Sequence, residues 1–163
     1  MSEPSLFDRL SAIDCRDHIE KKGKFNYLSW TWAWRTLKQH CPEARFQKHT
    51  FTDEMGREVP YMTNGEGVSF VKVTVFTNDD TQTELLPILN NGNKPIINPN
   101  SFDVNTSMQR CMVKAIAMLG LGLYIYAGED VPEGAEPLSP YTKKEEDEMV
   151  KQYSSSTDLG DIF

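Results

Sequence analysis

The sequence has few of the features that mark membrane, secreted, metal-binding or catalytic proteins. No stretch approaches the roughly 18 to 20 consecutive apolar residues that a membrane-spanning helix needs. Residues 1–4 carry no basic start and no apolar segment, so we expect no signal peptide. Cys15, Cys41 and Cys111 form no C-x-x-C pair, and Cys15 with His18 supplies only half of a zinc motif. We therefore predict a cytoplasmic protein with free thiols and no bound metal.

Signatures of catalysis are also missing. The sequence contains no nucleophile elbow, no Walker loop and no HExxH motif. The Gly120–Gly122 segment (GLG) follows an expected helix instead of opening one, so it does not fit a dinucleotide site. The acid pairs at 79–80 and 129–130 lie in turn or boundary contexts, where carboxylates are ordinarily solvated. These absences predict a protein that is not an enzyme and needs no cofactor.

Negative charge is concentrated at one end of the chain. The formal net charge is −7, from 17 basic and 24 acidic residues. Residues 1–128 hold 14 basic and 14 acidic residues, whereas residues 129–163 hold 3 and 10. Phosphate contacts require Lys and Arg, and the neutral body leaves room for a face that carries them. We therefore predict a folded domain over residues 1–130 and an acidic, flexible tail over residues 131–163.

Hydrophobic periodicity predicts an α+β fold in which antiparallel strands precede one long helix. We expect helices over 4–13 and 29–39, and a third from a cap at Asp103 or Asn105 to about Leu119, with Gly120 as its stop. The expected strands are 44–52, 59–63, 67–77 and 81–89. Segments 21–27 and 90–100 are predicted to be loops. We expect core positions for at least two of the tryptophans at 30, 32 and 34.

The long helix carries the first candidate binding residues. Arg110 and Lys114 are four residues apart and share a helix face, with Gln109 as a polar neighbour. Two like charges so placed repel one another unless an anion lies opposite them. A nucleic-acid phosphate is one such anion. A solvated helix face and salt bridges to acids elsewhere are the alternatives.

A second candidate cluster lies at residues 21–30, where lysines alternate with aromatic residues. This pattern suits single-stranded nucleic acid, because cations follow the phosphates and rings stack on unpaired bases. Core aromatic residues beside an ordinary basic loop would give the same pattern. Lys72 lies between two phenylalanines on one strand face. It is a weaker sign of nucleic-acid binding, since any half-buried sheet shows such alternation. The candidate residues outside the long helix are Lys22, Lys24, Tyr27, Lys72 and Lys94.

Four segments of the body carry a specific combination of motifs. They are Tyr27–Trp34 (YLSWTWAW) followed by Leu86–Leu89 (LPIL), Arg110–Ala117 (RCMVKAIA) within Asn105–Gly122, and Gly120–Asp130 (GLGLYIYAGED). Together and in this order they resemble a phage and prophage family of Sak-type single-strand annealing proteins. The resemblance covers about residues 5–131.

Membership of that family implies a fold distantly like the eukaryotic Rad-type annealing proteins, with a β-β-β-α core. It implies rings or helical filaments whose basic groove holds single-stranded DNA, and ATP-independent annealing of complementary strands in phage recombination. Arg110 and Lys114 would lie in the groove, and Lys22, Lys24 and Tyr27 on an adjoining loop. Two cations on the helix are few, so many subunits would have to act side by side. A passive DNA-binding or replication-accessory module without annealing activity is the alternative.

The last residues of the acidic segment form a separate candidate site. Asp158, Asp161, Ile162 and Phe163 are similar to the acidic tip of bacterial single-strand-binding proteins, although the proline before Phe is absent and there are fewer Asp residues. Such a tip inserts its Phe into an apolar pocket while its carboxylates meet Arg or Lys. The similarity implies binding to host partners of single-strand-binding proteins. A solubilising tail, or a competitor for the protein's own DNA groove, is the alternative.

Overall fold

The computed structural model describes residues 2–22, 25–126 and 148. The chain divides into two units, Met1–Ile125 and Tyr126–Phe163, and the fold described below is that of the first. The predicted tail over 131–163 lies, apart from residue 148, outside the described residues. Its flexibility and the domain boundary at residue 130 therefore stay predictions.

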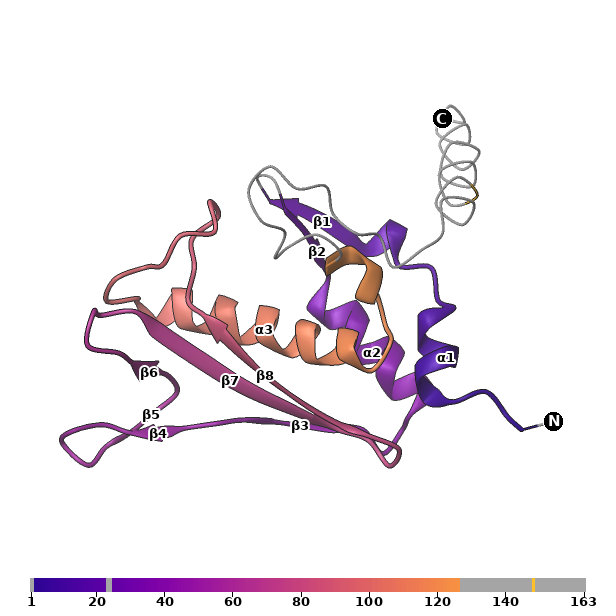
Figure 1. Cartoon of the computed structure of the whole chain (residues 1–163), viewed down its shortest axis with the longest axis horizontal. Coiled ribbons are helices and arrows are strands. Elements are labelled where there is room, and N and C mark those ends of the chain that lie inside the picture. Colours follow the sequence, from indigo (N-terminus) through magenta and orange to yellow (C-terminus); the bar gives the residue numbers. More distant parts are fainter. Residues whose placement is uncertain (1, 23–24, 127–147, 149–163) are drawn as a thin grey trace. The chain divides into compact units, whose positions relative to one another are not determined.

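The described part has an α+β fold, as predicted, and all its strand pairs are antiparallel (Figure 1). The helices are α1 (Leu6–Ser11), α2 (Trp30–His40) and α3 (Ser101–Met118), with 3₁₀ turns η1 (Arg16–His18) and η2 (Leu123–Tyr126). The strands are β1 (Ile19–Lys22), β2 (Phe25–Leu28), β3 (Arg45–Lys48), β4 (Phe51–Thr52), β5 (Glu58–Val59), β6 (Met62–Thr63), β7 (Ser69–Phe76) and β8 (Thr81–Pro87).

Strand β7 is the centre of the main sheet. It pairs with β8 along its whole length from residue 70 to 76, so β3 and β6 share its other edge. Val71, Val73 and Val75 are fully buried and alternate with less buried residues. Successive side chains of a strand point to opposite faces, so the three valines form one face, on which α3 packs. This apolar layer is the core of the fold.

The long helix α3 begins one turn earlier than predicted. Asn100 is its N-cap: the Asn100 side chain accepts the Asp103 backbone N–H at 2.8 Å, and the Asp103 carboxylate accepts the Asn100 backbone N–H at 3.1 Å. The predicted caps, Asp103 and Asn105, are therefore wrong, because Asp103 fills the third position of a capping box instead. The predicted stop is confirmed, since the helix ends at Met118 and Gly120 follows with φ +121°.

The basic segment 21–27 was expected to be a loop, and this expectation is wrong. Strands β1 and β2 pair from Ile19↔Leu28 to Lys22↔Phe25. Ile19, Phe25 and Tyr27 favour strands. The pairing of β1 with β2 satisfies backbone N–H and C=O groups, and the sequence pattern does not reveal this pairing. Lys21, Lys22 and Tyr27 therefore belong to paired strands and not to a loop.

The expectation that at least two of the three tryptophans lie in the core is also wrong. Trp30 is 41% exposed, and Trp32 and Trp34 are half-buried. The buried positions of α2 are Ala33, Thr36 and Leu37. Small and aliphatic side chains let α2 approach α3 closely, and the large indoles are left at the margins of that contact.

The remaining sequence expectations concern membranes and thiols. None of the described helices combines the length and the apolar character that crossing a bilayer requires. Cys15, Cys41 and Cys111 are all buried, and their thiols are free.

Candidate nucleic-acid interface

The two candidate clusters of the sequence meet at one contact between β2 and α3. The guanidinium carbon of Arg110 lies 4.4 Å from the centre of the Tyr27 ring. Both side chains are half-buried. A guanidinium held flat on an aromatic ring keeps its edge N–H groups available for an anion. The contact therefore presents an oriented cation at the surface between the hairpin and the long helix.

The segment after α3 packs against the elements that hold the hairpin. A Cβ at Gly120 would lie 2.6 Å from the Phe7 carbonyl oxygen, and one at Gly122 would lie 3.2 Å from a Leu28 methyl carbon and 3.5 Å from the Cys15 sulfur. Both glycines have positive φ, +121° and +73°. The GLG motif is thus a packing motif, which lets the chain run against α1 and the end of β2, next to Tyr27.

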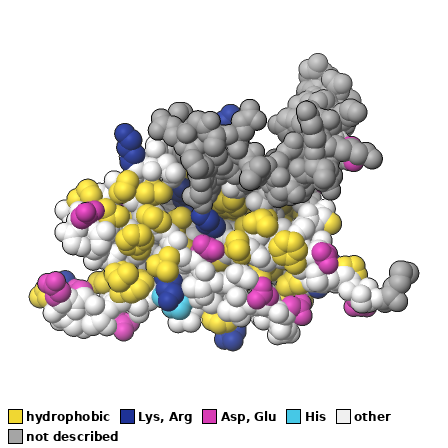
Figure 2. Space-filling view, viewed as in Figure 1, with side chains coloured by type: hydrophobic (Ala, Val, Ile, Leu, Met, Phe, Trp, Pro, Cys, Tyr) yellow, Lys and Arg dark blue, Asp and Glu magenta, His cyan; other side chains and the backbone are white. Residues whose placement is uncertain are grey.

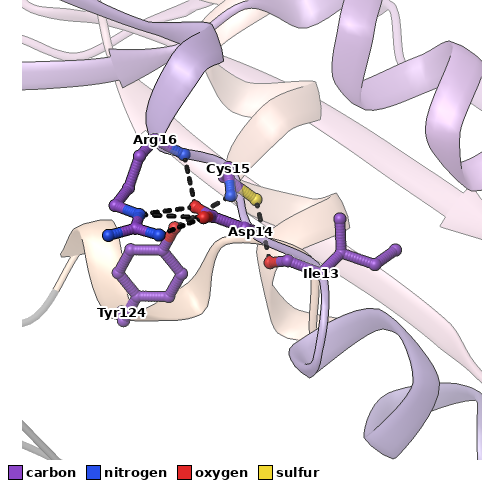
Figure 3. A network of polar contacts seen from close by, with 5 residues as sticks. All are labelled: Ile13, Asp14, Cys15, Arg16 and Tyr124. Atoms are coloured by element: carbon purple, nitrogen blue, oxygen red, sulfur yellow. Dashed lines mark hydrogen bonds and ion pairs between the residues drawn. The ribbon is translucent and has the colours of Figure 1, made fainter. Parts of the chain in front are cut away.

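A polar network fixes the segment that leads into β1 (Figure 3). The Tyr124 hydroxyl accepts the Cys15 backbone N–H at 3.1 Å. The Asp14 carboxylate accepts the Arg16 backbone N–H at 3.0 Å and the Arg16 Nε–H at 2.8 Å. These bonds from Arg16 lower the pKa of Asp14 to about 2. Burial raises the pKa of Tyr124, so its hydroxyl stays protonated. The network ties η2 to the start of the hairpin that carries Tyr27.

Lys114 lies one turn beyond Arg110 and is half-buried, as is Gln109. The Cys111 thiol donates a hydrogen bond to the Glu84 carbonyl oxygen at 3.2 Å. Burial raises the pKa of Cys111 to about 12, with a further increase from Glu84 and an opposing decrease from Lys114. Lys114 follows Cys111 by three residues on α3 and therefore lies near the point where α3 contacts β8. Arg110, by contrast, contacts β2.

The structure places the other candidates at separate points. Lys22 is the last residue of β1, but its side chain and the whole of Lys24 lie outside the described atoms. Lys94 is exposed on the loop before α3, where its backbone N–H donates to the Asn90 side chain at 3.0 Å. The partner-binding candidates Asp158, Asp161, Ile162 and Phe163 lie outside the described residues.

Lys72 is separated from Arg110 by the sheet itself. It alternates with Val71 and Val73, which face α3, so it lies on the opposite face of β7. Two residues that the sequence analysis missed share this face: the cation Arg45, which is paired with Phe76, and the imidazole of His49, whose backbone N–H donates to the Lys72 carbonyl. The sequence shows that positions 45 and 49 have the same parity in one expected strand and so share a face. It does not show that this strand pairs with β7.

Two further features lie apart from the Tyr27–Arg110 contact. Across residues 2–22, 25–126 and 148, no three His, Cys, Asp or Glu residues gather as metal ligands would. His18 instead stacks on Trp32 with ring centres 4.2 Å apart. A cleft of about 530 Å³ lies beside the first turns of α3, with Tyr61 and Met108 in its wall. None of the candidate residues lines it.

Comparison with known families decides which protein class this geometry belongs to. The model of the Sak single-strand annealing proteins matches residues 5–158. The chain belongs to this family. No curated protein matches it. The match confirms the resemblance in the sequence motifs and extends past residue 131. In this Sak protein the Tyr27–Arg110 contact joins the segments YLSWTWAW and RCMVKAIA, both of which lie within the matched residues.

Proposed function

We propose that this Sak protein binds single-stranded DNA at the Tyr27–Arg110 contact and anneals complementary strands without nucleotide hydrolysis, in phage homologous recombination. Family membership supports the activity. The stacking of Arg110 on Tyr27 is the observation that supports the site, because the pair combines a phosphate-binding cation with an aromatic ring. No covalent step is involved, so the protein acts as a binding catalyst of pairing and not as an enzyme.

The chemistry of the site follows from its geometry. The Arg110 guanidinium is planar and can donate two parallel N–H bonds to one phosphate. Its ring contact restricts its rotamers before DNA arrives, which reduces the entropy lost on binding. Neutralised strands repel one another less, so a second complementary strand approaches at a lower electrostatic cost. Base stacking then drives the pairing.

A single chain offers few cations for this task. Arg110 makes no ion pair within the described residues, and Lys114 and Gln109 are its polar neighbours on α3. Each phosphate contact to a single strand contributes about 0.7 to the salt slope of binding and only a modest affinity. We therefore propose a homo-oligomer, a ring or helical filament, in which the contacts of many chains add along one strand.

The experiment that tests the function uses two complementary labelled oligonucleotides. The wild-type protein should bind one strand and accelerate pairing with the other. Arg110→Gln should weaken strand binding and lower the salt slope by about 0.7. Arg57→Gln is the matched control, since it removes one exposed cation from the turn between β4 and β5, where Arg57 pairs with Asp53. Binding without faster pairing would contradict annealing and favour the passive binding module.

For the acidic segment we propose binding to host partners of single-strand-binding proteins through Asp158, Asp161, Ile162 and Phe163. The acidic and apolar character of these residues supports the proposal. Pull-down of such partners should succeed with the full chain and fail when Ile162 and Phe163 are deleted. Equal recovery with both chains would refute it.

A further inference from the structure

The face of the main sheet that points away from α3 has an unusual set of side chains. Strand register fixes its members, because paired residues of antiparallel strands lie on the same face. They are Arg45, Gln47 and His49 from β3 and its continuation, Met62 from β6, Phe70, Lys72, Thr74 and Phe76 from β7, and Thr81, Thr83, Leu85 and Pro87 from β8. None is a carboxylate. The one carboxylate of these strands, Glu84, pairs with Val73 on the α3 side.

Cations and rings are interleaved on this open face. The Arg45 guanidinium carbon lies 4.6 Å from the centre of the Phe76 ring. Lys72 lies between Phe70 and Phe76 on β7 and is paired with Leu85, which is 51% exposed. At about 3.3 Å per residue, the two rings lie roughly 20 Å apart along the strand. The face is thus an elongated row of apolar and cationic side chains.

Hydrogen bonds hold the middle of this row rigid. His49 Nε2 and the Thr74 hydroxyl are 2.7 Å apart, and the Thr74 and Thr83 hydroxyls are 2.8 Å apart. Burial and the nearby Lys72 cation lower the pKa of His49. The polar groups in the centre satisfy one another, so the outer cations Arg45 and Lys72 and the two rings are the groups that face a ligand.

No described helix packs over this face as α3 packs over the other, and Arg45 is exposed while Phe70, Lys72 and Phe76 are half-buried. In Figure 1 α3 runs along β7 and β8 on one side of the sheet, and no other labelled helix crosses these two strands. In Figure 2 a Lys or Arg side chain and a His side chain lie side by side against hydrophobic surface, close to the position of β3 in Figure 1. A row of cations and rings is therefore open to solvent.

We propose that this open sheet face, Arg45–Phe76 and Lys72–Phe70, is a second surface for single-stranded nucleic acid. The inference rests on the proposed function and extends it. Aromatic rings accept unpaired bases irrespective of sequence, and interleaved cations accept the phosphates. The sheet and α3 separate this face from the Tyr27–Arg110 contact. One chain can therefore hold two strands apart, as a protein that brings complementary strands together requires.

The test compares two charge-matched double variants of the full chain. Arg45→Gln with Lys72→Gln removes both cations of the open face. Lys48→Gln with Arg57→Gln removes two cations elsewhere: Lys48 pairs with Val73 and so lies on the α3 side, and Arg57 lies in the β4–β5 turn. We expect the first variant to lower the salt slope of strand binding by about 1.4 and to slow pairing about tenfold. The second should match the wild type.

Ultraviolet crosslinking to a thymidine oligonucleotide gives an independent readout. We expect a crosslinked peptide containing Phe70 or Phe76, and it should persist in the Arg110→Gln variant. Crosslinks confined to other strands, with equal behaviour of the two double variants, would overturn the proposal. A change in oligomer mass without a change in salt slope would also overturn it, because the face would then join copies of the chain. If the wild-type protein binds no strand, the proposed function itself fails.

Discussion

The guanidinium of Arg110 stacks on the ring of Tyr27 at 4.4 Å, and this contact joins the middle of α3 to the β1–β2 hairpin. It links two segments that are far apart in the chain and that each carry a family motif. It also orients a cation that α3 alone would leave with many rotamers. The hairpin is therefore part of the surface that we propose binds single-stranded DNA.

The stacking contact should be measurable as a coupling between the two residues. We expect a double-mutant cycle of Tyr27→Leu and Arg110→Gln to give a coupling of about 0.5–1 kcal/mol in the free energy of unfolding. Tyr27→Phe keeps the ring and should retain most of it. Urea unfolding of the single and double variants measures the effect. Additive effects of the two substitutions would refute the contact.

Replacing Arg110 by Lys tests whether DNA binding needs the planar guanidinium or only its positive charge. The charge is retained, so the salt slope of single-strand binding should stay unchanged, while affinity falls because an ammonium makes no forked contact. Fluorescence anisotropy over a range of salt concentrations measures both quantities. An unchanged affinity would show that the guanidinium geometry is irrelevant to DNA binding.

Gly120 is a position where any side chain is strained. Its φ of +121° and the Phe7 carbonyl at 2.6 Å from a Cβ oppose even a methyl group. We expect Gly120→Ala to lower the free energy of unfolding by at least about 2 kcal/mol. Gly65→Ala is the control, because a Cβ there meets nothing within 4 Å. Equal urea midpoints for the two variants would contradict this packing.

The Tyr124 hydroxyl should contribute to stability through the backbone N–H of Cys15, from which it accepts a hydrogen bond. Tyr124→Phe leaves the Cys15 N–H without that acceptor and should cost about 1 kcal/mol of stability. Hydrogen exchange at the Cys15 amide should become faster in the same variant. An unaltered exchange rate would show that the bond does not protect this segment.

Acid should weaken the fold partly through Asp14. Its folded pKa of about 2 lies below the ordinary value of 3.8, so its stabilising effect is complete above about pH 4 and is lost as the pH falls toward 2. The carboxylate is 55% exposed, so screening limits the effect to about 0.5–1 kcal/mol. Asp14→Asn should flatten the stability profile between about pH 4 and pH 2, as urea unfolding over this range can measure.

The thiols should be inert in the folded protein. Burial raises the pKa of Cys15 to about 11 and that of Cys111 to about 12, and it also raises that of Cys41. Little thiolate then exists at pH 8, and the sulfurs are inaccessible. Iodoacetamide should label them only after unfolding, as mass spectrometry can show. Rapid labelling of the native chain would contradict this burial.

Hydrophobic periodicity and turn residues predicted helices and strands where these sequence signals were strong. The helix from 29 and the strands expected over 67–77 and 81–89 are found close to the expected bounds, whereas the strands expected over 44–52 and 59–63 are each divided into two short strands. The β1–β2 hairpin was missed because lysine and glycine interrupt the alternation of apolar and polar residues that marks a strand. The two strands are held by their pairing with each other, which the sequence does not show. The expectation of at least two core tryptophans was wrong because the buried face of α2 is formed by Ala33, Thr36 and Leu37, and not by the stripe that Trp30 and Trp34 share.

The sequence by itself determined the family, the α+β class, the neutral body with its acidic extension, and the candidates Tyr27 and Arg110. Only the tertiary structure decided which of these residues meet. The packing of β2 on α3 brings Tyr27 to Arg110, and the register of β3 on β7 sets Arg45 beside Phe76, on the face opposite α3. Periodicity reports which way a side chain points along its own element. Contacts between elements depend on register and packing, which long-range burial selects and no local pattern encodes.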